Sequence, residues 1–383
     1  MARGAGRLER GTTRDRVNAP RALALDLATR RLSLSTGATP RPAPSEALLA
    51  TLLTGIDGTD EEVLAGEAGE PPRDAARWVL GHECLAEVVQ APEGSGLAQG
   101  DRVVPVVRHG CGGCEACSLG TPDYCPTDDY TEHGIKGLDG FMRDAFADDA
   151  ASLVSAPASL GDLAVLAEPM SVAIKALDTA RHIARRVPWF EREGGFAGRR
   201  ALVAGTGSLG SLAALLLRDE GMEVWGLDRS GDETAAARLL ADVGAEHVNA
   251  RERSIRDVAE EVDGFDLVIE ATGAPRVVFD ALHTLAGNGV MVMLGVPSDR
   301  PPLDVDGDAI MRRMVLRNQV LVGSVNSHRG QYEEALARLE DIRPRWNGAL
   351  ERVVTHTFAP EDFEAAFADA GPDAIKKVID WRR

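Results

Sequence analysis

Four cysteines close together in the sequence offer four thiolate ligands to one metal ion. Cys111, Cys114, Cys117 and Cys125 give the pattern C-x2-C-x2-C-x7-C, which suits a closed tetrahedral zinc site. An iron–sulfur cluster is the rival, because Pro126 follows the last cysteine. The bacterial ferredoxin pattern, however, has three residues before that cysteine rather than seven. Disulfides are disfavoured, because the Arg-rich first residues contain no apolar secretion signal. We predict a structural zinc, whose closed ligand set leaves no position for a substrate.

A glycine-rich turn predicts a dinucleotide site. Residues 205–210 read Gly-Thr-Gly-Ser-Leu-Gly, directly after the apolar run Arg200–Ala204 and before an Ala- and Leu-rich segment at 209–220. In this context the first glycine makes the turn, the second lets the backbone approach a pyrophosphate, and the third lets helix and strand pack closely. The following helix N-terminus offers amide donors to the phosphates. A plain glycine-rich turn is the alternative. The residues expected to bind the cofactor here are Gly205, Gly207, Ser208, Leu209 and Gly210.

The next apolar run ends in a residue that bears on the choice of cofactor. Asp228 stands where a carboxylate accepts a hydrogen bond from the ribose 2′-hydroxyl of NAD, and a 2′-phosphate would meet like charge there. Arg229 follows directly, and its guanidinium can pair the 2′-phosphate of NADP. A solvated surface charge is the alternative for Arg229. The sequence leaves both cofactors open and favours NAD slightly.

Two further motifs follow apolar runs at 266–270 and 289–294. They are Thr272-Gly273 and Leu294-Gly295-Val296. Ligands bind beyond the carboxyl ends of parallel strands, so we expect Thr272, Gly273, Leu294 and Val296 to line the nicotinamide. Simple turns are the alternative.

Three polar motifs contain residue types that bind metals. They are Gly55-Ile-Asp57-Gly-Thr59-Asp60, Gly81-His82-Glu83 and Glu168-Pro169. Taken singly, they are typical of a turn, a core histidine and a helix start. The H-E-x-x-H pattern of zinc proteases is excluded, because no second histidine follows four residues after His82.

Two kinds of segment must position these residues. Short apolar runs broken by Gly, Pro and Asp, such as Cys84–Gln90 and 102–107, predict a β-rich unit. A helical stretch is expected at 163–186. After residue 200 apolar runs alternate with helical segments, which is typical of a parallel sheet covered by helices on both faces. We predict an α/β protein in three parts: a disordered extension at 1–20, a β-rich domain at 21–178 and 325–383 that carries the cysteine lobe (108–127), and a doubly wound Rossmann domain at 179–324.

The excess of acidic residues disfavours two classes of partner. The 383 residues include 42 Lys+Arg and 60 Asp+Glu, a formal net charge of −18. Nucleic-acid binding requires a basic face and an anionic membrane attracts polybasic segments, so neither partner is expected. No apolar run approaches the ~18 residues of a membrane-spanning helix. The lack of a secretion signal and the clustered cysteines predict a cytoplasmic protein. Only four basic residues are lysines, which indicates either a GC-rich genome or adaptation to salt.

In their order along the chain these motifs resemble those of the zinc-dependent medium-chain alcohol dehydrogenases. More narrowly, they resemble the glucose dehydrogenase branch known from archaea and some bacteria. Further segments that match are 130–137 (Tyr-Thr-Glu-His-Gly-Ile-Lys-Gly), 294–299 (Leu-Gly-Val-Pro-Ser-Asp) and 322–328 (Val-Gly-Ser-Val-Asn-Ser-His). The resemblance runs from about residue 21 to the C-terminus. It implies a GroES-like catalytic domain and a homodimer or homotetramer, in part through pairing of residues 319–322 across subunits.

The resemblance implies a catalytic zinc held by Asp57, His82 and Glu168, with Glu83 as an additional or exchanging ligand. Most relatives carry Cys at the position of Asp57, and the harder oxygen ligand implies weaker metal retention. The implied reaction oxidises an aldose, first of all D-glucose, at C1 to the lactone. Zinc polarises the hydroxyl, Thr59 relays the proton, and the hydride passes to NAD(P)+.

The resemblance also implies substrate contacts. Glu132 matches the sugar-binding acid of the family, Asn326 matches a late asparagine that faces both sugar and cofactor, and Glu168 lies beside them. A solvated loop charge is the alternative for Glu132. Val107 departs from relatives that carry Asn there, and His133 and His328 are expected near the cleft or on the surface. Two other functions stay open: a polyol or secondary-alcohol dehydrogenase of sorbitol or threonine type, and a catalytically silent NAD(P)-binding sensor.

Overall fold

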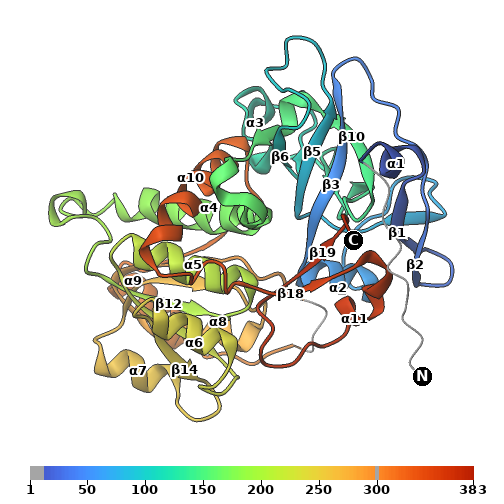
Figure 1. Cartoon of the computed structure of the whole chain (residues 1–383). Coiled ribbons are helices and arrows are strands. Elements are labelled where there is room, and N and C mark those ends of the chain that lie inside the picture. The colour runs from blue at the N-terminus through green and yellow to red at the C-terminus, as the bar shows by residue number, and fades with distance from the viewer. Residues whose placement is uncertain (1–12, 298–301) are drawn as a thin grey trace, which may run out of the picture.

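Two large sheets of different types organise the chain (Figure 1). The computed structural model describes residues 13–297 and 302–383. The first sheet has seven strands, and both ends of the chain contribute to it. In spatial order its strands are β11 (Leu153–Ser155), β6 (Arg102–Pro105), β5 (Cys84–Gln90), β3 (Glu46–Ile56), β19 (Lys376–Asp380) and β18 (Val354–Phe358), with β10 (Ala145–Asp149) paired to the first half of β3.

Smaller elements surround this sheet. One three-stranded sheet contains β2 (Arg31–Thr36), β1 (Arg21–Asp26) and β4 (Arg77–Val79), and another contains β7 (Arg108–His109), β8 (Thr131–His133) and β9 (Gly137–Leu138). The short helices of this part are α1 (Thr13–Asn18), α2 (Gly58–Ala65), α3 (Glu115–Ser118) and α11 (Phe363–Phe367). The second small sheet carries the base of the cysteine lobe.

The second large sheet is parallel and has six strands. In order they are β14 (Glu246–Asn249), β13 (Glu223–Asp228), β12 (Arg200–Ala204), β15 (Phe265–Glu270), β16 (Leu285–Met293) and β17 (Val320–Gly323). The helices that follow its strands are α5 (Ser208–Asp219), α6 (Ala235–Asp242), α7 (Ile255–Glu261), α8 (Pro275–Leu282) and α9 (Gly307–Leu316).

The packing of β12, a central strand of this sheet, explains why its residues 201–204 are all apolar. Successive side chains of a strand point to opposite faces. Ala201 and Val203 pack into one hydrophobic core, whereas Leu202 and Ala204 pack into another with residues of α7 and α8. Both faces are therefore buried, as parallel sheets require. The predicted α/β class, a β-rich part with a doubly wound parallel sheet, is confirmed.

Two long helices connect the two sheets. α4 (Ala167–Ala184) and α10 (Arg329–Arg345) pack against each other and lie between the β-rich part and the parallel sheet (Figure 1). One hydrophobic core contains residues of both sheets and of both helices. α4 continues across the predicted boundary at residue 178, so the division of the chain at 178 and 324 stays a prediction.

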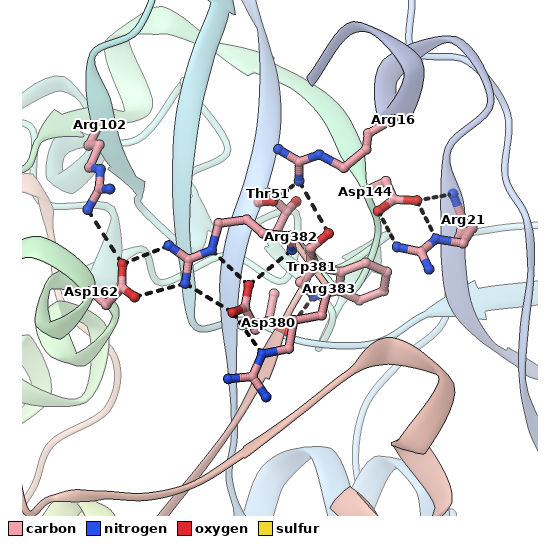
Figure 2. Close-up of polar contacts among 11 residues, drawn as sticks. Arg16, Arg21, Thr51, Arg102, Asp144, Asp162, Asp380, Trp381, Arg382 and Arg383 are labelled. Carbon is pink, nitrogen blue, oxygen red and sulfur yellow. Dashed lines mark hydrogen bonds and ion pairs between the residues drawn. The ribbon is translucent and has the colours of Figure 1, made fainter. Parts of the chain in front are cut away.

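The structure differs from the predicted N-terminal extension over part of its length. Thr13–Asn18 form the helix α1, and Val17 is buried. Arg16 Nη1 donates hydrogen bonds to the carbonyl oxygens of Thr51, at 2.8 Å, and Trp381, at 3.4 Å (Figure 2). The expectation of disorder is therefore wrong for these residues, because they satisfy backbone carbonyls of the main sheet. The remainder of the predicted extension, residues 1–12, lies outside the described residues.

The C-terminal residues are held by ion pairs beside this contact (Figure 2). Arg382 bonds Asp162 at 2.8 Å and Asp380 at 2.8 Å. Asp162 belongs to a 3-10 helix (Ala158–Leu166) that leads into α4. These pairs fix the end of β19 against the segment that precedes Glu168. Within the described residues, no helix is both long and apolar enough to cross a membrane.

Candidate active site

A cleft of about 630 Å³ is lined by residues of both large sheets and their loops. Its walls come from the loop after β3, the start of α4, the N-terminus of α5 and the loops after β15, β16 and β17. Most of the residues selected from the sequence meet here. Those that line the cleft are Asp57, Thr59, His82, Glu83, Glu132, Glu168, Gly207, Ser208, Leu209, Gly210, Thr272, Gly273, Leu294, Val296 and Asn326.

The first wall contains a compact group of metal-binding side chains. Asp57 directly follows β3 and caps α2, and its Oδ1 accepts hydrogen bonds from the backbone amides of Thr59 at 2.8 Å and Asp60 at 3.3 Å. This capping leaves Oδ2 facing His82, with 3.4 Å between Oδ2 and Nε2. Single ligand atoms of Asp57, His82 and Glu83 all lie within 4.8 Å of one another. Helix capping therefore aims the first ligand at the second.

The other ring nitrogen of His82 faces a second carboxylate. Nδ1 lies 3.5 Å from Oδ1 of Asp60, which is 1% exposed. A carboxylate behind a histidine orients the ring and its tautomer in metal sites. Burial by itself lowers the pKa of His82, but Asp57 and Asp60 raise it well above its ordinary value. Asp60 was not selected from the sequence as a site residue.

Glu83 has a buried partner that sequence reasoning missed. Its carboxylate forms an ion pair with Nζ of Lys376 on β19, and the two side chains are 1% and 0% exposed. Lys376 also donates to the carbonyl oxygen of Ile56 at 3.2 Å. A Cβ on Gly55 would lie 1.7 Å from Oε2 of Glu83, so only glycine leaves room for this pair. The signal available in the sequence was Lys376 itself, one of only four lysines, at the start of the C-terminal run Lys-Lys-Val-Ile-Asp.

Glu168 stands in the first turn of α4 on the same cleft and is 7% exposed. Burial raises its pKa to about 8, His82 opposes this shift, and Glu83 adds to it. It is not part of the close group of Asp57, His82 and Glu83. All four predicted ligands therefore line one cleft. Asp57, His82 and Glu83 are close neighbours, whereas Glu168 on α4 does not belong to their close group.

The donor set fits a zinc ion. Zinc lies roughly 2.0–2.2 Å from nitrogen and oxygen ligands, so two tetrahedral ligands lie roughly 3.4 Å apart, and Asp57 Oδ2 and His82 Nε2 have this separation of 3.4 Å. Three buried acidic side chains of this group, Asp60, Glu83 and Glu168, also stand beside only one lysine of the group, Lys376. The raised pKa values of His82, Glu83 and Glu168 mean that these side chains tend to retain protons, and a divalent cation would take the place of those protons. We name Asp57, Asp60, His82, Glu83, Glu168 and Lys376 the acidic cluster.

The predicted sugar-binding acid is buried rather than solvated. Glu132 is 6% exposed, and its Oε1 accepts from Nε of Arg108 at 2.8 Å and from Nδ2 of Asn326 at 2.5 Å. Asn326 has φ +55, a left-handed conformation that asparagine tolerates. The alternative of a solvated loop charge is therefore wrong for Glu132. Arg108, its partner, was not selected from the sequence.

Three further residues lie away from the cleft lining. Val107 is fully buried, and its backbone amide donates to the Tyr332 hydroxyl at 3.3 Å. His133 is buried, and His328 caps the N-terminus of α10. The surface alternative is wrong for His133, which is buried and lies on β8 directly after the cleft residue Glu132.

The glycine-rich turn has the form that a pyrophosphate requires. Gly205 has φ +92, and a Cβ on Gly210 would lie 1.7 Å from the carbonyl oxygen of Gly205. Around Gly207, by contrast, no atom would lie within 4 Å of an added Cβ. Gly207 caps α5 without a side-chain hydrogen bond, and Oγ of Ser208 is buried with no hydrogen-bond partner among the described residues. The open helix N-terminus and the unsatisfied hydroxyl fit a phosphate group.

Asp228 and Arg229 lie beyond this turn and outside the cleft lining. Asp228 Oδ1 accepts from the Ser230 amide at 2.6 Å and lies 3.1 Å from Nε2 of His247, and Thr206 donates to Oδ2. Burial raises the pKa of Asp228, but the hydrogen bonds from Thr206 and Ser230 lower it and outweigh burial. The net pKa therefore lies below its ordinary value. The carboxylate is thus ionised at neutral pH. Arg229 is exposed.

The cysteine lobe brings its four sulfurs together. The Sγ atoms of Cys111 and Cys117 are 3.9 Å apart, and those of Cys114 and Cys125 are 3.7 Å apart. Zinc–sulfur bonds of about 2.3 Å place tetrahedral sulfurs roughly 3.8 Å apart. The donor set therefore fits a closed four-thiolate zinc site.

Comparisons with known proteins agree with this architecture. The family model "Alcohol dehydrogenase GroES-like domain" matches residues 43–158, and "Glucose dehydrogenase C-terminus" matches residues 161–381, more than half of the chain. The chain belongs to the glucose dehydrogenase branch of the zinc-dependent medium-chain alcohol dehydrogenases. The predicted family is confirmed, and with it a GroES-like domain and an oxidoreductase.

Several relatives cover most of this glucose dehydrogenase-like chain. A glucose 1-dehydrogenase of Methanocella arvoryzae is 38% identical over 82% of this chain and 86% of its own length. A glucose 1-dehydrogenase of Haloterrigena turkmenica is 38% identical over 88% of this chain and 90% of its own. Among solved structures, Haloferax mediterranei glucose dehydrogenase in complex with NADP, Zn and gluconolactone is 35% identical, has a TM-score of 0.86, and covers 94% of this chain and 99% of its own.

Proposed function

We propose that this protein oxidises an aldose, first of all D-glucose, at C1 to the aldonolactone and transfers the hydride to NAD(P)+. One observation carries the proposal: a single cleft joins the acidic cluster on one wall to the glycine-rich turn on the other. The Haloferax mediterranei relative, which binds NADP, Zn and gluconolactone, supports the same substrate class.

We infer that Asp57, His82, Glu83 and Glu168 hold the catalytic zinc. When bound, such an ion supplies Lewis-acid polarisation of an alcohol oxygen, and the nicotinamide supplies the hydride acceptor. The role of the chain is to fix the ligands before substrate arrives. Asp57 is held by the cap of α2, and Glu83 is held by Lys376. Cys111, Cys114, Cys117 and Cys125 hold a second, structural zinc.

The remaining cleft residues bind the sugar and move its proton. Thr59 lines the cleft two residues after Asp57, where its hydroxyl accepts the C1 hydroxyl proton and passes it on. Glu132 accepts hydrogen bonds from sugar hydroxyls, and its hydrogen bond from Arg108 fixes the position of its buried carboxylate. Asn326, bonded to the same carboxylate, presents its other amide atoms to sugar and cofactor.

For the cofactor we assign the pyrophosphate to the N-terminus of α5 and the turn at Gly205, Gly207, Ser208, Leu209 and Gly210. Thr272, Gly273, Leu294 and Val296 flank the nicotinamide. The ionised Asp228 stands at the adenosine ribose and favours NAD, while the exposed Arg229 can pair a 2′-phosphate. Asp228→Ser is expected to raise the ratio of kcat/KM with NADP to kcat/KM with NAD, because the negative charge is lost. Arg229→Ala is expected to lower the same ratio.

We also infer a cytoplasmic homodimer or homotetramer. β17 is an edge strand of the parallel sheet, and the neighbouring α9 exposes Met311, Val315 and Leu316, which are 68%, 75% and 72% exposed. Exposed apolar patches beside a free strand edge are typical of subunit interfaces. Light scattering after size exclusion tests this, with Val315→Asp expected to shift the mass toward the monomer.

The activity is tested by initial rates with a panel of aldoses, polyols and secondary alcohols, each with NAD+ and NADP+. We expect glucose to give the highest kcat/KM and a chelator to abolish turnover. Activity that survives complete removal of metal overturns the mechanism. A polyol as the preferred substrate favours a sorbitol or threonine type of dehydrogenase, and cofactor binding without turnover of any substrate favours a sensor.

A further inference from the structure

A third group of metal-binding side chains lies outside both sites described above. His109 on β7, His133 on β8 and Asp148 on β10 offer ligand atoms that all lie within 4.8 Å of one another. His109 Nε2 is 3.5 Å from Asp148 Oδ1, and His133 Nε2 is 3.6 Å from Asp148 Oδ2. The three residues line neither the cleft nor the four-sulfur group. We name them the two-histidine group.

The atoms that face one another in this group lack hydrogen bonds. Nε2 of His109, Nε2 of His133 and Oδ2 of Asp148 are buried and have no hydrogen-bond partner among the described residues. The side chains of His133 and Asp148 are 7% and 4% exposed. A buried polar atom without a partner is costly, so three such atoms that converge on one point indicate a ligand-binding site.

The tautomer of the buried histidine points the same way. His133 Nδ1 lies 2.8 Å from the carbonyl oxygen of Asp139. A carbonyl oxygen only accepts hydrogen bonds, so Nδ1 carries the proton and Nε2 presents a lone pair to the group. The ring of His109 is likewise bonded to the backbone of Val106. Metal-binding histidines commonly donate their other N–H to a backbone carbonyl in this way.

The distances fit a metal better than direct hydrogen bonds. Direct bonds between these atoms would be about 2.7–3.2 Å long, shorter than the observed 3.5 and 3.6 Å. Two ligands of tetrahedral zinc lie roughly 3.4 Å apart. The same spacing, 3.4 Å, separates Asp57 and His82 in the acidic cluster.

We propose that His109 Nε2, His133 Nε2 and the Asp148 carboxylate bind one further divalent transition-metal ion, Zn2+ first of all. Two imidazoles and one carboxylate are a ligand set of zinc sites with an open fourth position. The side chain of His109 is 27% exposed, which gives the ion a route from solvent. The site ties β8, which carries Glu132, to β10, which pairs with the central strand β3.

Zinc analysis of the full-length protein tests the proposal. The protein is incubated with excess ZnCl2, passed through a desalting column and analysed by inductively coupled plasma mass spectrometry. We expect His109→Gln and Asp148→Asn each to carry one zinc per chain less than the unmodified protein. The matched control is His356→Gln, on β18, which should carry as much zinc as the unmodified protein. Variants that retain the full zinc content overturn the proposal.

Cobalt substitution separates this site from the nearby cysteine lobe. With Co2+ in place of Zn2+, the four-thiolate site gives a sulfur-to-metal charge-transfer band in the near ultraviolet. Since His109 is two residues from Cys111, loss of that band in His109→Gln would mean that the missing ion came from the lobe, and the proposal would fail. An unchanged band together with weaker visible d–d absorption supports a separate nitrogen–oxygen site.

Discussion

The cysteine lobe and the acidic cluster both offer ligands to a metal ion, yet the fold builds them in opposite ways. The lobe takes four soft sulfur ligands from fifteen consecutive residues, 111–125. The acidic cluster takes oxygen and nitrogen ligands from the ends of β3, β5 and α4 and balances them with Lys376, more than 290 residues after Glu83. A local loop specifies the first site, whereas the whole topology specifies the second.

The two regions also differ in charge and exposure. Three of the lobe cysteines are partly exposed, while Asp60, Glu83, Glu168 and Lys376 are at most 7% exposed. A buried charge raises the free energy of the folded state unless an opposite charge pairs with it. We therefore expect a cation to reach the buried acidic cluster only through the cleft, whereas the ligands of the cysteine lobe lie partly at the surface.

The regions are nevertheless connected. Asp123 in the lobe pairs with Nζ of Lys175 on α4 at 2.5 Å, and Lys175 donates to the carbonyl oxygen of Val325 at 2.8 Å. Arg108, at the base of the lobe, donates to the Asp123 carbonyl at 3.3 Å and holds Glu132. The lobe thus supports the loop that carries Asn326 and also Glu132, the proposed sugar-binding acid.

The strongest test of the comparison removes one ligand from each region. His82→Ala is expected to lower kcat/KM by roughly 10⁴-fold, because the variant loses several kcal/mol of transition-state stabilisation. Each tenfold loss in rate corresponds to about 1.4 kcal/mol of activation free energy. Cys114→Ser should retain turnover within a few-fold. Steady-state kinetics with zinc in the assay checks both. Equal losses in the two variants would remove the functional distinction between the regions.

Stability should respond most to the lysine of the acidic cluster. Lys376→Met leaves Glu83 buried without its partner, and breaking a buried ion pair costs about 3–5 kcal/mol. The control is Lys377→Met, whose ion pair with the half-exposed Glu61 lies at the surface and is worth about 0–1 kcal/mol. Urea unfolding measures both. A double variant, Lys376→Met with Glu83→Gln, should recover part of the loss, and no recovery would argue against the pair as the cause.

A smaller effect is expected where the lobe meets the substrate. Glu132→Gln keeps the shape of the side chain but removes the charge held by Arg108. Hydrogen bonds to charged groups contribute about 1.5–3 kcal/mol, so we expect roughly a 10–100-fold loss in kcat/KM for the aldose with little change in the KM of the cofactor. Glu115→Gln, in the lobe, is the control. A rise in the cofactor KM alone would contradict the sugar-binding role.

The smallest expected effect is the change in sugar binding at the cleft when the cysteine lobe is altered. Cys114→Ser should raise the KM for the sugar a few-fold and leave kcat nearly unchanged, because Asp123, Arg108 and Lys175 lose a rigid support. The measurement is the separate determination of kcat and KM with saturating cofactor. An unchanged KM in a protein that has lost the lobe zinc would show that the lobe acts independently of the cleft.

The same contrast explains what the sequence predicted and what it did not. The spacing of Cys111 to Cys125 and the turn after Arg200–Ala204 are local patterns, so their structures follow from short-range geometry. Lys376 was missed because its role depends on the antiparallel pairing of β19 with β3, where Lys377 lies opposite Ile56. No local pattern encodes that register. Asp60 and Arg108 were missed for a related reason, because each one acts by holding another side chain. Asp60 faces His82, and Arg108 donates to Glu132.

Two departures from the local sequence pattern have the same physical origin. Glu132 resembles a loop charge in the sequence, but Arg108 and Asn326 bury it. Residues 13–18 resemble a polar extension, but Arg16 bonds carbonyl oxygens of residues 51 and 381. In both places, partners distant in the sequence override the local polar composition.

Anomalous X-ray scattering at the zinc edge, from crystals of the full-length protein grown with zinc and NADP+, tests the central claim most directly. The peak within the cysteine lobe serves as the internal reference. We predict a peak in the cleft, bonded to Asp57 and His82 and adjacent to Glu83 and Glu168, in addition to the one expected at the two-histidine group. A strong peak at the four sulfurs with none between Asp57 and His82 would contradict the assignment of the acidic cluster as the catalytic metal site.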